Sequence, residues 1–200
     1  ALLVKRDEGL EVVRRGTEKG HTYHLLNHTR GPKKSFEAYM VTMDDASEEF
    51  PTFSHPGTEF LHLLEGELLL NVADDPRPLR VVTGNGLLQL SSGRFNVRQW
   101  ADHSQVAVLQ GRAMLAGHAL EAGQQARFDG PRWGATHAVD ANTGAWVDGM
   151  LVAAHTRLGD FIDDLARYRR GQLTCDPAVA DLLLSGSYPL ADSERILDLL

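Results

Sequence analysis

Apolar and polar residues alternate in short runs over the first 150 residues of the chain. Such runs, separated by turn-forming residues, are typical of the strands of β-sandwiches and barrels. The predicted strands are 11–15, 22–27, 36–43, 59–64, 67–72, 79–83, 87–90, 95–99, 105–109, 113–116 and 126–128. Glu65 and Gly66 predict a hairpin in which residues 68–70 pair with residues 61–64. The pattern therefore predicts a mainly β fold of the sandwich or barrel type.

The last fifty residues show a helical pattern. Apolar residues recur at the period of a helix, which predicts an amphipathic helix over residues 157–169 with Thr156 as its cap. Its apolar positions are Leu158, Phe161, Ile162, Leu165 and Tyr168, and its polar positions are Asp160, Asp163, Asp164 and Arg167. Short strands over 172–174 and 180–184 and a final helix over 193–200, capped by Asp192, complete a small α+β unit.

Two groups of residues in this unit have a structural interpretation. The apolar residues Ile196, Leu199 and Leu200 of the final helix are expected to pack against residues 182–184, since amphipathic faces usually build core. The basic residues Arg167, Arg169 and Arg170 lie at a helix end, where cations are favoured. We therefore assign them to the helix terminus and not to a binding patch.

Composition changes near residue 72. Residues 1–72 contain all four lysines, nine glutamates and three aspartates, whereas residues 73–200 contain no lysine, twelve arginines, thirteen aspartates and two glutamates. Such a shift indicates a boundary. The sequence thus predicts three regions: a β region over 1–72, a second β region over 73–148 that continues the same body, and the α+β unit over 149–200.

Charge, cysteine content and hydropathy exclude several classes. A formal charge of −7 with no basic stripe argues against nucleic-acid binding. The single cysteine, Cys175, excludes an internal disulfide and a cysteine-based metal cluster. No segment has the roughly twenty apolar residues that a membrane-spanning helix needs, and the charged N-terminus is too short for a signal peptide.

His55, Glu59 and Gly66 follow the spacing of the first cupin motif, with Phe53 in place of its first histidine. Residues 5–70 resemble the cupin sensor domain of helix-turn-helix regulators. The resemblance implies that His55 and Glu59 face one barrel cavity, where such groups can hold a divalent metal. The second cupin motif is absent, and His103 and His137 lack its proline and glycine neighbours. The alternative is a hydrogen-bonded polar pair at the mouth of a barrel.

Catalytic motifs are weak. Ser91, Ser92 and Ser104 lie near His103, but there is no nucleophile elbow, phosphate-binding loop or dinucleotide fingerprint. A serine–histidine–aspartate set assembles in space and not in sequence, so it stays open as an alternative. The sequence predicts a protein that is not an enzyme and has no catalytic residues.

Residues from Leu64 onward resemble the periplasmic part of FecR-type regulators. The ordered positions that carry the resemblance are Pro76, Arg77, Pro78, Thr83, Gly86, Arg94, Phe95, Val97 and Arg98, followed by residues 106–111 and by Leu120, Gly123 and Gln124. These positions also have a structural meaning. Phe95 and Val97 are expected on one face of a strand, with Arg94, Asn96 and Arg98 on the other.

Residues 150–200 resemble the secretin and TonB short N-terminal domain that ends FecR-type regulators. The family implies a protein partner, the signalling domain of a TonB-dependent outer-membrane receptor, and a periplasmic location; the cupin half implies a cytoplasmic one. Neither a membrane segment nor a sigma-factor tail is predicted in this chain. Docking by strand addition or helix packing is the expected mode, with the contact residues unknown.

Two function classes follow from these resemblances. One is a signalling and protein-interaction module of the FecR type, and the other is a cupin sensor of a small molecule or metal. A recombined or engineered hybrid without its own activity is a third interpretation. An exposed sheet edge left by such a join favours a homodimer.

Overall fold

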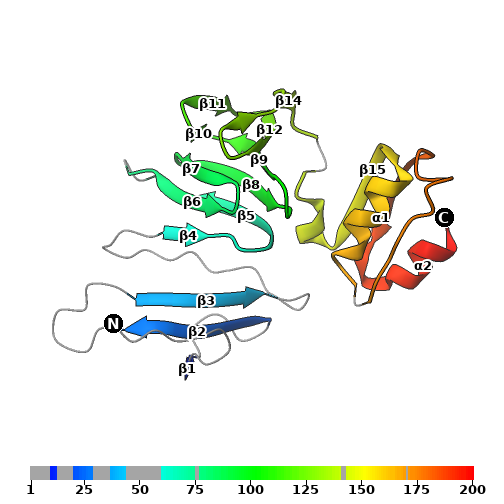
Figure 1. The fold of residues 1–200 in the computed structure, drawn as a ribbon, viewed down its shortest axis with the longest axis horizontal. Coiled ribbons are helices and arrows are strands. Elements are labelled where there is room, and N and C mark those ends of the chain that lie inside the picture. The colour runs from blue at the N-terminus through cyan, green and yellow to red at the C-terminus, as the bar shows by residue number, and fades with distance from the viewer. Residues whose placement is uncertain are drawn as a thin grey trace. The chain divides into compact units, whose positions relative to one another are not determined.

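The computed structural model describes residues 10–12, 20–28, 37–43, 60–74, 77–140, 143–169 and 171–200 (Figure 1). The chain divides into two compact units, residues 1–56 and 57–200. Among these residues, strands dominate and helices occur only in the C-terminal part, which confirms the predicted mainly β fold class with a small C-terminal α+β unit. The three-region division with boundaries near residues 72 and 148 stays a prediction.

The first unit contains a three-stranded antiparallel sheet. Its strands are β1 (Leu10–Glu11), β2 (His21–His28) and β3 (Glu37–Met43), in the order β1-β2-β3. A bulge lies between Leu25 and Asn27 of β2. Tyr23 is buried, and its ring meets that of Tyr39 edge to face at 6.4 Å. The sheet matches the strands predicted over 22–27 and 36–43.

The second unit begins with two sheets. The five-stranded sheet has the order β11 (His118–Glu121), β10 (Arg112–Leu115), β7 (Gly86–Leu90), β6 (Leu79–Thr83) and β4 (Phe60–His62). The six-stranded sheet has the order β13 (Arg132–Trp133), β12 (Gln124–Asp129), β9 (Ser104–Gln110), β8 (Gly93–Gln99) and β5 (Gly66–Val72), with β14 (His137–Ala138) also paired to β12.

One hydrophobic core joins these two sheets into a sandwich. Alternate residues of each strand point inward, so the buried positions come from both sheets. The five-stranded sheet contributes Val81, Leu88, Leu90, Ala113, Leu115 and Leu120, and the six-stranded sheet contributes Phe95, Val97, Val106, Val108, Ala126 and Phe128. The predicted alternation in 95–99 is confirmed, since Phe95 and Val97 are fully buried.

The predicted hairpin at Glu65 and Gly66 is wrong. Strand β4 pairs in parallel with β6, and β5 pairs antiparallel with β8, so the chain crosses from one sheet to the other at these residues. Gly66 has a φ of +96°, which allows the sharp turn. An alternating pattern specifies a strand and its inward face, but it does not specify the partner strand, because Leu68 and Leu70 can cover the core from either sheet.

A close backbone contact joins the start of β8 to the end of β9. A Cβ atom on Gly93 would lie 2.1 Å from the carbonyl oxygen of Gln110, and one on Gly111 would lie 2.2 Å from that of Ser92. Gly111 also has a φ of +89°. Glycine is therefore needed here for space as well as for backbone conformation.

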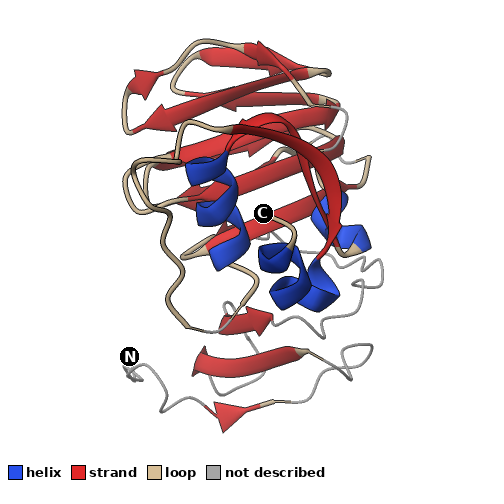
Figure 2. Cartoon of the chain, turned by 90° about the vertical axis from the view of Figure 1, so that its right-hand side faces the viewer, coloured by secondary structure: helices blue, strands red, loops and turns tan. Residues whose placement is uncertain are grey.

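The C-terminal part follows the 3₁₀ helix η1 (Ala145–Asp148). It consists of β15 (Met150–Arg157), α1 (Leu158–Ala166), β16 (Leu183–Pro189), η2 (Leu190–Asp192) and α2 (Ser193–Asp198). Strands β15 and β16 form an antiparallel pair. Figure 2 shows the helices and this curved strand pair side by side, and Ala153, Phe161, Leu165 and Ile196 form their common buried core.

Several predictions for this part need correction. The first helix spans Leu158–Ala166 and not 157–169, and Thr156 does not cap it, since Thr156 Oγ1 accepts a hydrogen bond from the N–H of Ala154. Residues 172–174 form no strand, the strand expected at 180–184 begins at Leu183, and β15 was not predicted. Strand β15 has no clean alternation because a bulge interrupts its pairing between Ala153 and Thr156.

For the last helix, the predicted cap is confirmed and the predicted packing is confirmed in part. The cap is confirmed, because Asp192 Oδ1 accepts a hydrogen bond from the N–H of Arg195 at 3.1 Å. Ile196 is buried against the α1 core, whereas Leu199 is 70% exposed and Leu200 is also exposed. The packing expected of this apolar face is therefore confirmed for Ile196 and wrong for Leu199 and Leu200.

Candidate partner-binding surface

The two residues of the metal hypothesis, His55 and Glu59, lie outside the described residues. His103 and His137, which would have to supply a third ligand in the absence of the second cupin motif, are both described. His103 contacts Asp102 through Nδ1 at 2.7 Å, and His137 lies exposed on β14. Within the described part of the chain, no group of three or more His, Cys, Asp or Glu residues is placed to hold a metal ion. The hypothesis stays a prediction, and elemental analysis of the wild type and of the His55→Ala and Glu59→Ala variants tests it.

The serines near His103 have structural roles. Ser104 is fully buried, and its Oγ accepts a hydrogen bond from Asn85 Nδ2 at 3.0 Å. Ser91 Oγ donates to the carbonyl of Ser92 and accepts from the N–H of Arg112. Nε2 of His103 is buried and has no hydrogen-bond partner among the described residues. Over the described ranges, no serine is therefore placed for activation by this histidine.

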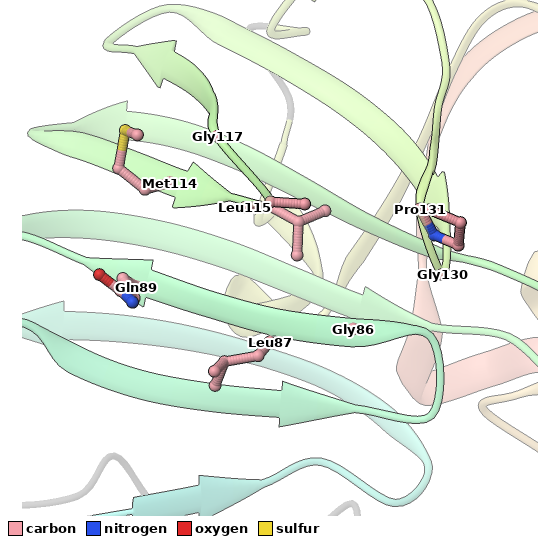
Figure 3. Close-up of a pocket in the computed structure, with 9 residues that line it drawn as sticks. Gly86, Leu87, Gln89, Met114, Leu115, Gly117, Gly130 and Pro131 are labelled. Carbon is pink, nitrogen blue, oxygen red and sulfur yellow. The ribbon is translucent and has the colours of Figure 1, made fainter.

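An open apolar depression of about 580 Å³ lies between β7, β10 and the turn after β12 (Figure 3). Its lining residues are Gly86, Leu87, Gln89, Met114, Leu115, Ala116, Gly117, Gly130 and Pro131. Gln89 is the one side chain among them with hydrogen-bonding groups, so the depression offers neither an acid or base nor a nucleophile.

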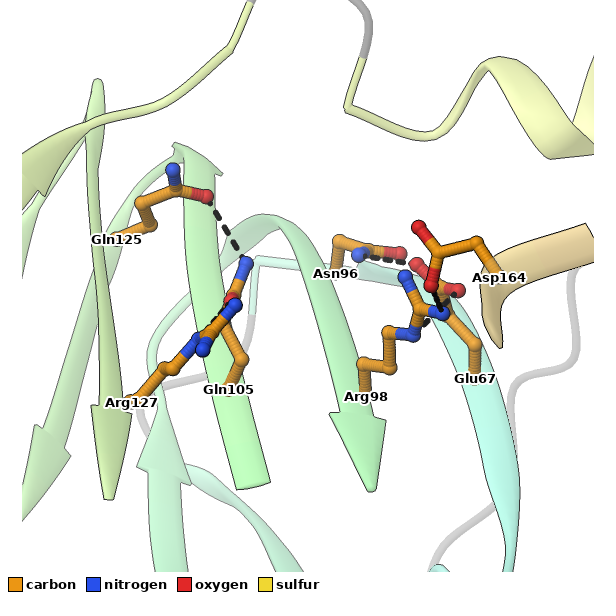
Figure 4. Close-up of polar contacts among 7 residues, drawn as sticks. All are labelled: Glu67, Asn96, Arg98, Gln105, Gln125, Arg127 and Asp164. Atoms are coloured by element: carbon orange, nitrogen blue, oxygen red, sulfur yellow. Dashed lines mark hydrogen bonds and ion pairs between the residues drawn. The ribbon is translucent and has the colours of Figure 1, made fainter. Parts of the chain in front are cut away.

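Charged side chains join the outer face of the six-stranded sheet to helix α1 (Figure 4). Asn96 Nδ2 donates to Glu67 Oε1 at 2.7 Å, and Arg98 Nε lies 3.5 Å from Glu67 Oε2. The Arg98 guanidinium also pairs with the carboxylate of Asp164 on α1. The side chains of Arg98 and Glu67 are only 14% and 10% exposed. We call these four residues the sheet–helix junction.

Trp100, directly after β8, lies among three arginines. The guanidinium carbon lies 4.4 Å from the centroid of the Trp100 ring for Arg98, 5.7 Å for Arg127 and 5.6 Å for Arg167. The imidazole of His103 stacks on the same indole at 4.5 Å. Cations at such distances are attracted by the ring's negative faces. The indole of Trp100 thus contacts arginines from strand β8, from strand β12 and from the end of α1.

Burial shifts the titration of two groups beside the junction. The pKa of Tyr168 is raised to about 12, first by burial and then by the charge of Glu67. The pKa of Arg167 is lowered, first by burial and then by the charge of Arg98. At the exposed Asp102, the pKa is lowered mainly by the hydrogen bond to His103. The raised pKa keeps the Tyr168 hydroxyl protonated at neutral pH, whereas burial and the charge of Arg98 disfavour the charged form of Arg167.

Sequence reasoning missed this cluster. It assigned Arg167, Arg169 and Arg170 to favourable charge at a helix end. The structure places Arg167 over Trp100 and pairs Arg169 with Glu194 at 2.6 Å, and Arg170 lies outside the described residues. One signal was available, since the alternation of strand 95–99 places Asn96 and Arg98 on its outer face. The residues that meet them come from distant segments, which no local pattern specifies.

Neither helix in the part of the chain that the structure describes is long and apolar enough to cross a lipid bilayer.

Comparison with known proteins gives a family match and a shared fold. Residues 38–114 match the family of FecR proteins. Two crystal structures, each described as a "putative anti-sigma factor" from Parabacteroides distasonis, match with TM-scores of 0.57 and 0.58 at 22% and 21% identity. Each match covers 99% of this chain and 88% of the other. No protein of curated function matches the sequence.

The family match begins before the point at which the sequence resemblance to FecR was placed. It starts at residue 38, within β3, and ends at residue 114, within β10, so it includes the crossing at Gly66. The cupin resemblance of residues 5–70 and the secretin and TonB resemblance of residues 150–200 have no counterpart in these comparisons. The chain therefore shares its fold with those structures over nearly its whole length, and the FecR similarity lies in residues 38–114.

Proposed function

We propose that this protein is a FecR-type regulatory module that transmits a signal through protein contacts and not through catalysis. The observation that carries the proposal is the FecR match over residues 38–114 within a fold shared along 99% of the chain. In the described part of the chain, no group of three or more His, Cys, Asp or Glu residues is placed to hold a metal ion. A natural FecR-type chain is favoured over a cupin–FecR hybrid, because the match includes the region of the supposed join.

The finer proposal concerns partner and compartment. By its resemblance, the chain receives a signal in the periplasm from the signalling domain of a TonB-dependent outer-membrane receptor, and the C-terminal part is a secretin and TonB short N-terminal domain. Exposed apolar residues there support a contact role, since Leu182, Leu183 and Leu199 are 60%, 62% and 70% exposed. Large apolar side chains left in water commonly mark protein-interaction surfaces.

The sheet–helix junction suggests how such a contact is passed on. Asp164 of α1 is paired with Arg98, which also contacts Glu67 of β5. A partner that moves α1 changes the environment of two mostly buried charges in the sandwich. Because a buried charge that loses its partner is costly, the two parts are energetically coupled.

Isothermal titration calorimetry tests the proposal. The protein is titrated with separately produced signalling domains of the TonB-dependent receptors from the source genome. We expect one domain to bind with a Kd of about 10 μM or tighter, the range of specific signalling contacts. The control is an unrelated β-domain of similar charge. Absence of binding to every domain by the folded protein would count against the proposed partner class.

The possible homodimer stays a prediction of the sequence. Light scattering across a concentration series measures it directly. A constant monomer mass at the highest concentration would contradict it.

A further inference from the structure

Strand β16 forms a sheet edge that lacks most of the features that keep edge strands from pairing. It spans Leu183–Pro189, and β15 is its one partner strand among the described residues. Natural proteins protect such edges with short strands, charged side chains, prolines or bulges. The sequence of β16, LLSGSYP, has seven residues and no charged one, and its single proline stands at the last position. This edge is therefore open to pairing with a further strand.

The other sheet edges of residues 57–200 are better protected in the part of the chain that the structure describes. Strands β4, β11, β13 and β14 have only two to four residues each, and β5 carries the charged Glu67. Strand β15 is interrupted by a bulge, and His155 in it has a φ of +54°. Of these described edges, β16 combines length, regularity and absence of charge.

The backbone groups of β16 divide between its two sides. At one end of the strand pair, the N–H of Leu190 donates to the carbonyl of Gly149 at 2.8 Å. At the other end, the N–H of Leu158 donates to the carbonyl of Leu182 at 2.7 Å. In an antiparallel pair, every second residue bonds to the same neighbour. The residues of β16 that face β15 in this way are therefore Leu184, Gly186 and Tyr188.

The remaining residues of β16 direct their backbone groups to the free edge. The N–H groups there belong to Leu183, Ser185 and Ser187, and all three residues are exposed. Pro189 faces the same way and has no N–H, which agrees with the position that proline takes in edge strands. An incoming strand thus meets donors and acceptors that pair with no other described strand.

The side chains of β16 are symmetrical in kind about Gly186. Serine stands on either side of this glycine, and apolar residues occupy the next two positions in both directions. An antiparallel copy centred on Gly186 would place serine opposite serine and apolar opposite apolar, which are favourable cross-strand pairs. The facing pairs would be Ser185 with Ser187, Leu184 with Tyr188, and Leu183 with Pro189. No like charges would meet, because the strand has none.

We propose that two copies of this chain associate through β16, in antiparallel orientation about a twofold axis at Gly186. Strands β15 and β16 of both copies then form one continuous sheet. The N–H of Ser187 in one copy donates to the carbonyl of Ser185 in the other, and the N–H of Ser185 donates to the carbonyl of Ser187. The inference goes beyond the proposed function, since this self-association requires no receptor.

Helix α2 favours a second copy as the occupant of this edge. It packs on β16, whereas α1 packs on β15. The twofold axis is perpendicular to the sheet, so it keeps the helices of both copies on one face and brings the two α2 helices towards each other. Leu199 and Leu200, which follow α2, are 70% and 47% exposed. A second copy offers these apolar side chains a cover that the single chain lacks.

Sedimentation equilibrium over a concentration series tests the proposal. We expect the wild type to reach twice the monomer mass at high concentration. Ser187→Pro removes an N–H that faces the free edge and leaves the pairing with β15 intact, so it should weaken self-association about a hundredfold or more. The matched control, Ser187→Ala, removes the same hydroxyl but keeps the N–H, and should weaken it by about fivefold at most. Equal weakening by both variants overturns the proposal.

A second variant serves if Ser187→Pro fails to fold by circular dichroism. Ser187→Lys keeps the backbone N–H but places two like charges on one face of the shared sheet, so self-association should weaken about tenfold at low salt and recover at high salt. Its control is Ala119→Lys, which adds the same charge at an exposed position of β11. The same loss in the Ala119→Lys control overturns the proposal.

Amide hydrogen exchange measured by NMR locates the contact. The amides of Ser185 and Ser187 should exchange at least about tenfold more slowly in the dimer than in the monomer, because they gain hydrogen bonds. The amides of Gly186 and Tyr188 bond β15 in both states and should change little. A dimer in which Ser185 and Ser187 gain no protection overturns the contact through β16.

Calorimetry with the receptor domains separates this inference from the proposed function. A wild type that stays monomeric up to about 1 mM overturns the inference. If Ser187→Pro then also abolishes binding of a receptor domain, the edge belongs to the partner and not to a second copy. If no receptor domain binds while the wild type dimerises through β16, the proposed partner class is wrong and the inference is supported.

Discussion

The outer faces of the two sheets differ, although both sheets share one core. On the six-stranded sheet, Arg98 and Glu67 are mostly buried and connect to α1 through Asp164. On the five-stranded sheet, the ion pair of Arg112 and Glu121 is 2.7 Å long but more than half exposed, next to an apolar depression. The same strand alternation thus produces two kinds of surface. Here the enclosed charges connect β8 to α1, whereas the exposed pair connects only the neighbouring strands β10 and β11.

The largest loss of unfolding free energy is expected from a substitution where the chain passes from one sheet to the other. Gly111 links β9 to β10, and Gly117 lies in the turn between β10 and β11; their φ angles are +89° and +88°. A Cβ atom at Gly111 would lie 2.2 Å from a carbonyl oxygen, but at Gly117 nothing lies within 4 Å. In urea unfolding, Gly111→Ala should lower the free energy of unfolding by about 4 kcal/mol or more, and Gly117→Ala by about 1 to 2 kcal/mol. Equal losses of unfolding free energy would mean that the positive φ alone, and not the lack of space at Gly111, accounts for the need for glycine at both positions.

The two ion pairs give the next comparison. Arg98→Met removes the partner of two partly buried carboxylates and should cost about 3 kcal/mol of unfolding free energy. Arg112→Met, the matched change on the exposed pair, should cost less than about 1 kcal/mol. Thermal and urea denaturation measure both. A small effect of Arg98→Met would show that the sheet–helix junction contributes little to stability.

Alkaline pH should lower the free energy of unfolding through Tyr168, which lies beside the sheet–helix junction. The pKa of Tyr168 is raised from 10.0 to about 12, mainly by burial. Because the pKa of Tyr168 is higher in the folded than in the unfolded state, its contribution to the free energy of unfolding is complete below pH 10. This contribution is lost as the pH rises through 12. Between pH 10 and 12, the wild type should lose about 2 kcal/mol more unfolding free energy than Tyr168→Phe. Parallel pH profiles of the two proteins would contradict this.

The smallest effect is expected on the five-stranded face. Leu87 is 41% exposed at the apolar depression, so Leu87→Ser should change the free energy of unfolding by less than about 0.5 kcal/mol. Affinity for the receptor domain should stay within about twofold of the wild type, a difference well below 1 kcal/mol. A tenfold loss in calorimetry would move the partner surface to this sheet.

Sequence patterns predicted most strands but not their partners. Residues 79–83 and 87–90 form neighbouring antiparallel strands as their short turn suggests. Residues 59–64 and 67–72 look like the same kind of pair, yet they lie in different sheets. The difference depends on how the two sheets cover each other, which is a tertiary property. Strand β15 escaped prediction for a local reason, since its bulge breaks the period of two.

The candidate surface could be predicted only in part. The outward position of Arg98 followed from the buried Phe95 and Val97. That Arg127 and Arg167 meet at Trp100 did not follow, because the three residues come from different elements far apart in the chain. Helix-end charge was a sufficient local explanation for Arg167. Its tertiary contact became visible only in three dimensions.

The parallel pairing of β4 with β6 has a consequence for the order of folding. The segment between β4 and β6 in the sequence contains β5, which belongs to the opposite sheet. The β4–β6 pair therefore cannot form as a local hairpin. Non-local pairings of this kind form slowly and late. With three residues, β4 is also the short strand at the edge of its sheet. We expect the N–H of Leu63, which donates to the carbonyl of Val82 at 2.8 Å, to exchange with solvent sooner than the amides shared by β8 and β9.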